Sequence, residues 1–99
     1  MDAMEALADP TRRRVVELLS AGELSAGEIA ARFEHSRPAV SRHLRLLREA
    51  GLVDVRAEGT RRVYVLRRDP LADAERWLRQ RLDALDTELR RGRRARSIP

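Results

Sequence analysis

The residues best suited to chemistry in this chain of 99 residues are arginines, and they are densest in its central third. Residues 36–68 hold nine Arg against three acids, whereas residues 1–35 hold four Arg against seven acids and residues 69–99 hold eight against six. The formal net charge of the chain is +5. A basic centre between mixed flanks is typical of a surface that binds a polyanion.

The central arginines fall largely on a predicted helix over residues 37–50. Ser36 is suited to capping its start, Pro38 is tolerated in the first turn, and Gly51 ends it. At about 100° per residue, apolar residues share one face. The opposite face carries Arg37, Pro38, Ser41, Arg42, Arg45, Arg48 and Glu49.

Such a helix fits the major groove of DNA, where arginine binds guanine O6 and N7 through two hydrogen bonds. We expect the residues at the start of the helix to lie against bases, with Arg37, Ser41 and Arg42 as the candidates for reading them. Arg45 and Arg48, further along, are expected to meet phosphates. Taken alone, this helix is equally consistent with an ordinary solvated face.

A β-hairpin is predicted after this helix, because Val53, Val55 and Ala57 alternate with charged residues and Gly59 marks a turn. The tip, at residues 57–62, carries Arg61 and Arg62. These side chains are suited to a phosphate backbone or to a minor groove, whose negative potential attracts arginine. The alternative is a solvated turn.

Three shorter helices are predicted before the basic one. Residues 2–8 form a short helical stretch. Asp9-Pro10 starts a second helix that Gly22 ends, and the capping box at residues 25–28 starts a third. The predicted fold class is mainly α with a small β-hairpin, in the order helix-helix-helix-helix-strand-strand-helix, which is the layout of a winged helix-turn-helix. We expect one domain over residues 1–92 and an Arg-rich tail over residues 93–99.

The last helix is predicted to start at Asp69-Pro70 and to end at Gly92. Its leucines recur three or four residues apart, as on one helix face. They could complete the core of their own chain, but the helix is long for so small a domain, so a homodimer interface is expected. The interface candidates are Leu71, Leu78, Leu82, Leu85 and Leu89, and Trp77 is expected to pack there or to line a ligand pocket.

Several classes of function are not expected. The chain has no cysteine, which excludes disulfides and thiolate metal sites. No nucleophile–base pair, carboxylate pair or phosphate loop is evident, so we expect no enzyme and no cofactor. The start of the chain is acidic and no apolar run could span a bilayer, so a cytoplasmic protein without a membrane partner is expected. His43 is expected to pack on its helix's apolar face, and His35 to be exposed in a turn.

Sequence-specific DNA binding is therefore the leading interpretation. A winged-helix module that docks an acidic protein partner is the alternative, and retarded migration of a DNA fragment would discriminate between them. A membrane-surface role for the last helix and its tail is weaker, because acids are distributed along that helix.

Three stretches of the sequence are similar to those of a known protein family. They are ALADPTR at 6–12, SRPAVSRHL at 36–44 and LREAGLV at 47–53. Together they closely resemble the ArsR family of transcriptional regulators, from about Met4 to the end of the last helix. The resemblance implies a dimeric repressor that pairs through its first and last helices, binds inverted repeats and is often released by an effector. It also implies that helix 37–50 is the recognition helix and the hairpin is the wing.

The departures from the family pattern concern sensing and the turn. Metal-sensing members carry Cys-x-Cys where this chain has Ser25-Ala26-Gly27, and the last helix lacks the histidine ligands of others. Hydroxyls are poor ligands for soft metals, so no metal site is expected, and the sequence does not identify a small-molecule effector. Glu34-His35 replaces the Gly and apolar residue common in the turn.

Overall fold

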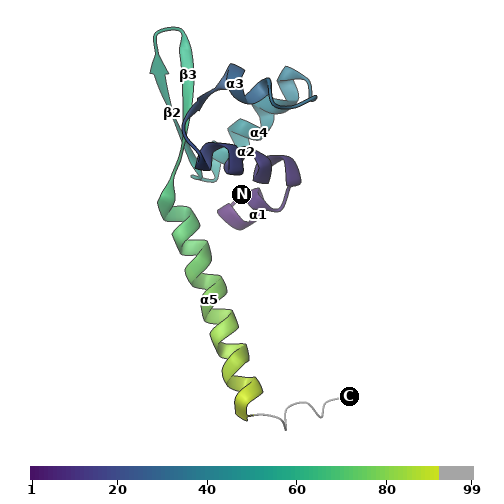
Figure 1. The fold of residues 1–99 in the computed structure, drawn as a ribbon, viewed down its shortest axis with the longest axis vertical. Coiled ribbons are helices and arrows are strands. Elements are labelled where there is room, and N and C mark those ends of the chain that lie inside the picture. The colour runs from purple at the N-terminus through teal and green to yellow at the C-terminus, as the bar shows by residue number, and fades with distance from the viewer. Residues whose placement is uncertain (92–99) are drawn as a thin grey trace.

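The computed structural model describes residues 1–91, and its elements follow the predicted order with one addition. A compact helical body lies beside a β-hairpin, and one long helix leaves that body (Figure 1). The molecule extends 62 Å along its long axis and 25 by 22 Å across it. The elements are α1 (Ala3–Leu7), α2 (Pro10–Ser20), β1 (Leu24–Ser25), α3 (Ala26–Ala30), α4 (Arg37–Glu49), β2 (Val53–Glu58), β3 (Arg61–Leu66) and α5 (Arg68–Arg91).

Local capping chemistry sets the starts of the body's helices. Asp9 accepts a hydrogen bond from the backbone of Arg12 at the start of α2, and Ser36 accepts one from Ala39 at the start of α4. Ser25 and Glu28 form the predicted capping box of α3. Each cap satisfies a backbone N–H that has no partner within its helix. These three predicted starts are confirmed.

The sheet has a third strand, which the sequence analysis missed. β1 pairs with β3, and the strand order is β1-β3-β2, all antiparallel. Two residues are too few to show an alternating pattern, so only the pairing in three dimensions defines this strand. It ties the linker between α2 and α3 to the hairpin.

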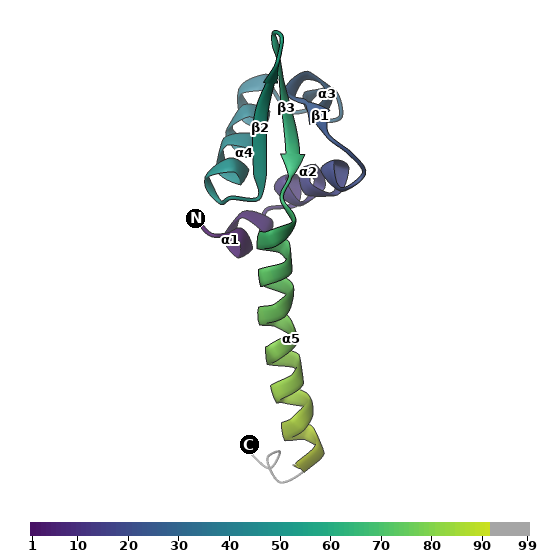
Figure 2. The same cartoon turned by 90° about the vertical axis from the view of Figure 1, so that its left-hand side faces the viewer.

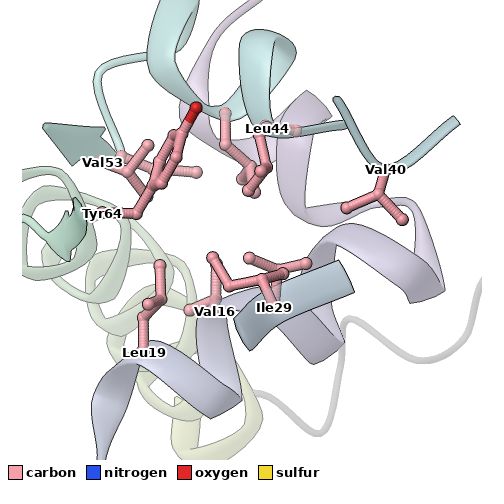
Figure 3. Close-up of a cluster of buried hydrophobic side chains, with 11 residues drawn as sticks. Val16, Leu19, Ile29, Val40, Leu44, Val53 and Tyr64 are labelled. Atoms are coloured by element: carbon pink, nitrogen blue, oxygen red, sulfur yellow. The ribbon is translucent and has the colours of Figure 1, made fainter. Parts of the chain in front are cut away.

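The core is a single cluster between the helices and one face of this sheet. Val55 lies opposite Tyr64 in the hairpin, which sets both side chains on the same face. Figure 3 shows Tyr64 and Val53 facing side chains of α2 and α4. The largest fully buried side chains are Ile29, Leu44, Leu47, Leu52, Val15 and Val53. Each side chain of this size stabilises the fold by about 1.5–3 kcal/mol when fully buried.

The long helix α5 starts earlier than predicted, at Arg68. Asp69 and Pro70 lie within its first turn, because a proline there removes no helical hydrogen bond and an acid there interacts favourably with the helix dipole. α5 packs on α1, and none of its residues is buried. No helix within residues 1–91 is long and apolar enough to cross a membrane. Gly92 and the tail at 93–99 lie outside the described residues.

Candidate nucleic-acid interface

Helix α4 has the two faces that its sequence predicts. Val40, Leu44 and Leu47 are buried in the core, which fixes the helix on the body. The opposite face is exposed to solvent. It presents Arg37, Pro38, Ser41, Arg42, Arg45 and Arg48.

The basic side chains of this face are largely unpaired. Arg45 lies 3.8 Å from the carboxylate of Glu49, one turn away, and both side chains are exposed. Exposed pairs of this kind contribute little. Within residues 1–91, Arg37, Arg42 and Arg48 form no ion pair. Their charges are therefore available to a ligand outside the chain.

A hydrogen-bonded cluster holds the inner face of α4 against α1 and α2. Arg12 donates from Nε to the backbone oxygen of Ala6 at 2.8 Å, and its Nη1 lies 3.3 Å from Nδ1 of His43. Because arginine can only donate, Nδ1 must accept, which leaves the ring proton on Nε2. Asp9 lies 3.8 Å from the same Nδ1. Burial lowers the pKa of His43, although the Asp9 carboxylate opposes this shift.

The turn between α3 and α4 is held from both sides of His35. Its ring stacks on Phe33, with centroids 5.7 Å apart, and its Nε2 lies 3.3 Å from the hydroxyl of Thr11. His35 is exposed, as expected, and Phe33 lies beyond the end of α3. These contacts order the Glu34-His35 turn without the glycine that the ArsR pattern commonly places there.

The hairpin tip projects past the helical body at the end opposite α5 (Figure 2). Arg61 donates to Glu28 of α3 at 3.2 Å, and the same Glu28 oxygen accepts the backbone N–H of Ser25 at 2.8 Å. Hydrogen bonding by Ser25 lowers the pKa of Glu28. Arg62 forms no ion pair among residues 1–91. The two arginines predicted at the tip thus differ, because only Arg61 is paired with an acid of the described chain.

Arg56 braces the hairpin, a role that the sequence analysis did not assign. Its guanidinium donates to both carboxylate oxygens of Glu23 and, at 2.8 Å, to Glu58. Hydrogen bonding from Arg56 lowers the pKa of Glu23. Glu23 lies 33 residues away in sequence and adjoins β1, so only the unrecognised third strand brings the pair together.

The predicted dimer residues fall into two groups. Leu71 packs against the core of its own chain. The other four leucines are 49 to 62% exposed, and we call them the leucine stripe: Leu78, Leu82, Leu85 and Leu89. Trp77 is half exposed beside the stripe, with the guanidinium of Arg81 4.9 Å from its ring centroid. The described residues hold no group of three or more potential metal ligands.

Comparison with known proteins agrees with this arrangement. A family described as "Helix-turn-helix domain" matches residues 7–56. The transcriptional repressor SdpR of Bacillus subtilis is 33% identical over 88 residues, which cover 89% of this chain and 98% of that protein. The HTH-type transcriptional regulator Rv2034 of Mycobacterium tuberculosis is 56% identical over 64 residues, 65% of this chain and 60% of that protein.

Solved structures share the same fold. The ArsR family transcriptional regulator RHA00566 superposes with a TM-score of 0.79 at 30% identity, over 84% of this chain and 91% of that one. A possible transcriptional regulator for arsenical resistance gives 0.75 at 42% identity, over 89% and 96% of the two chains. The chain therefore belongs to the ArsR family of winged helix-turn-helix transcriptional regulators.

Proposed function

We propose that this protein is a homodimeric transcriptional repressor that binds an inverted-repeat DNA operator. The observation that carries the proposal is the exposed arginine face of α4, which a packed inner face holds beside a basic hairpin tip. Such a helix suits the major groove. Relatives named as repressors, among them SdpR and the arsenical resistance operon repressor of Staphylococcus xylosus, support the direction of regulation. Members of this family are regulators and not enzymes.

The residues of the face divide by their distance from the start of α4. Arg37, Pro38, Ser41 and Arg42 lie in the first two turns, where a recognition helix meets base edges. Arg45 and Arg48 lie further along and are suited to phosphates. At the wing, Arg62 is free to contact the DNA backbone or a minor groove. Arg61 must break its ion pair with Glu28 before it can contact DNA.

The leucine stripe supports the homodimer. Four exposed leucines on one helix face form an apolar surface that a soluble chain rarely leaves bare. The charges beside the stripe favour antiparallel pairing of two copies of α5. Arg79 and Arg81 flank its first half, and Asp86 and Glu88 flank its second half. When the two helices run in opposite directions, the arginines of one copy therefore lie near the acidic residues of the other.

Antiparallel pairing also gives a useful spacing. With Leu82 opposite Leu85 of the partner, the two copies of Leu71 lie roughly 38 Å apart along the pair, at about 1.5 Å per residue. Because α4 lies on the body beyond the start of α5 (Figure 1), the recognition helices are at least this far apart, and they could read half-sites that are separated by one or more helical turns of about 34 Å each.

Selection of bound sequences from random DNA, followed by mobility shift and light scattering, tests this function. We expect the selected DNA to contain an inverted repeat and to bind a dimer at least about 10³ times more tightly than a shuffled duplex. A protein that is monomeric, or that binds selected and shuffled DNA equally, would contradict the proposal.

A further inference from the structure

A groove lies between α1 and the start of α5, and the DNA-binding function leaves it unexplained. Its volume is about 600 Å³, and its lining combines apolar and acidic side chains. Trp77 and Met4 contribute the large apolar surfaces, half and over one third exposed. Asp2 and Asp73 contribute carboxylates from the two sides. An aromatic ring beside two acids is suited to a guanidinium group.

The carboxylates have spare hydrogen-bonding capacity. Asp2 uses Oδ1 to cap α1, accepting from the backbone of Glu5 at 2.8 Å, and Asp73 uses Oδ1 to accept from Arg76 at 3.1 Å. Each carboxylate can accept about four hydrogen bonds. The guanidinium of Arg81 already lies over the Trp77 ring of the same chain, which is the geometry of a cation–π interaction.

We propose that, in the dimer, this groove binds the Arg-rich C-terminal segment of the partner copy, through Arg93 and Arg94 with Arg96 beside them. The proposal rests on the antiparallel homodimer described above. The segment supplies three cations in four residues, and the groove supplies two carboxylates and the indole ring. Docking would bring further cations to these carboxylates, of which Asp73 is already paired with Arg76, and would cover Trp77.

Distance assigns the segment to the partner copy and not to its own chain. Ala74 and Arg91 of one chain are 17 residues apart on α5, a rise of about 26 Å. The three residues from Arg91 to Arg94 span at most about 11 Å. In the antiparallel pair, however, Arg91 of the partner subunit comes level with Arg76, which is next to Trp77 and about one turn from Asp73. The groove also lies on the side of the stripe that carries Arg81, so in this pairing the end of the partner's α5 comes beside it.

Cysteine cross-linking tests the placement, because the natural chain has no cysteine. A Met4→Cys chain is co-expressed with an Arg94→Cys chain and oxidised mildly. We expect a disulfide-linked heterodimer, since a disulfide requires Cα atoms within about 7 Å. The matched control replaces Met4→Cys with Glu17→Cys, at an exposed position of α2, and is expected not to cross-link. Cross-linking no stronger than this control, or a disulfide formed within one doubly substituted chain, overturns the proposal.

Trp77 provides a second readout because it is the only tryptophan. Arg93→Gln with Arg94→Gln should increase acrylamide quenching of Trp77 and raise the dimer dissociation constant by about two- to fivefold. Arg13→Gln with Arg14→Gln on α2, an equal loss of charge, should do neither. A dimer that binds its operator but shows no cross-link and no change in quenching refutes this inference alone. A monomeric protein refutes it together with the proposed function.

Discussion

The arginines of this chain are equivalent in a charge count but differ in the structure. Arg12 is partly buried and joins α1, α2 and α4 through Ala6 and His43. Arg56 is held by two glutamates at the hairpin. Arg42, by contrast, lies on the exposed face of α4 and pairs with no described acid. Arg12 and Arg56 are thus engaged within the chain, whereas the guanidinium of Arg42 remains available to bind DNA.

Arg42 is predicted to read bases. Arg42→Ala should cost about 1–3 kcal/mol on operator DNA, because a base contact is lost, while binding to shuffled DNA falls much less. Arg48→Ala serves as the matched control on the same face. It should weaken binding to both duplexes equally, and it should reduce the slope of the logarithm of the binding constant against the logarithm of salt concentration by about one. Equal losses on the two duplexes for Arg42→Ala would make Arg42 a phosphate contact.

His43 is predicted to make stability depend on pH. Because burial lowers its folded-state pKa below 6.5, the unfolded chain takes up the proton first as pH falls. The free energy of unfolding should therefore fall as pH drops through 6.5 towards the folded pKa, and the contribution should be complete above 6.5.

Urea denaturation between pH 7.5 and 5 tests this. His43→Asn keeps an acceptor for Arg12 but cannot titrate, so it should flatten the profile. An unaltered slope in His43→Asn would mean that other groups cause the pH dependence.

At the scale of the elements, the sequence predicted what local chemistry determines. The caps at Asp9, Ser25 and Ser36 and the two faces of α4 depend on neighbours within a few residues, and the structure confirms them. β1 and the Glu23–Arg56 pair depend on residues 33 or more positions apart, and no local pattern encodes that pairing. The arginine face was therefore predictable from sequence, whereas the bracing of the wing and the pairing of Arg61 were not.

Glu28 is predicted to restrain the wing. Its carboxylate competes with DNA phosphates for Arg61, and an exposed pair of this kind holds the arginine only weakly. Glu28→Gln keeps an oxygen for the backbone of Ser25 but removes the charge. Non-specific DNA binding at low salt should rise by at most about fivefold.

Filter binding over a salt series measures the effect. Glu17→Gln is the comparison, since it makes the same charge change on α2, where Glu17 pairs with Arg14. A gain no larger than that of Glu17→Gln would show that Arg61 is not held back by Glu28.

At the scale of the whole molecule, the body has a complete core while α5 has no buried residue. Leu82→Asp with Leu85→Asp would place charges in the proposed dimer seam. We expect a monomer, with operator affinity reduced by about 10²–10⁴ because the half-sites are no longer linked. Light scattering, circular dichroism and operator binding on one sample separate dissociation from unfolding.

Gln80→Asp with Thr87→Asp adds the same charges on the far side of α5 and should leave a dimer that binds normally. If the leucine double variant also stays dimeric with unchanged affinity, α5 is not the interface.

Because α5 stands away from the body, repression should depend steeply on the concentration of the protein. If α5 pairs with a second copy as proposed, assembly depends on how much protein is present. Below the dimer dissociation constant, the concentration of dimers rises with the square of the number of chains. A twofold change in synthesis would then change the occupancy of an unsaturated operator about fourfold, and dilution during cell growth would lift repression more steeply than the loss of chains alone. The exposed leucines of α5 would thus set a threshold for repression, which substitutions in the stripe could shift without altering any contact to DNA.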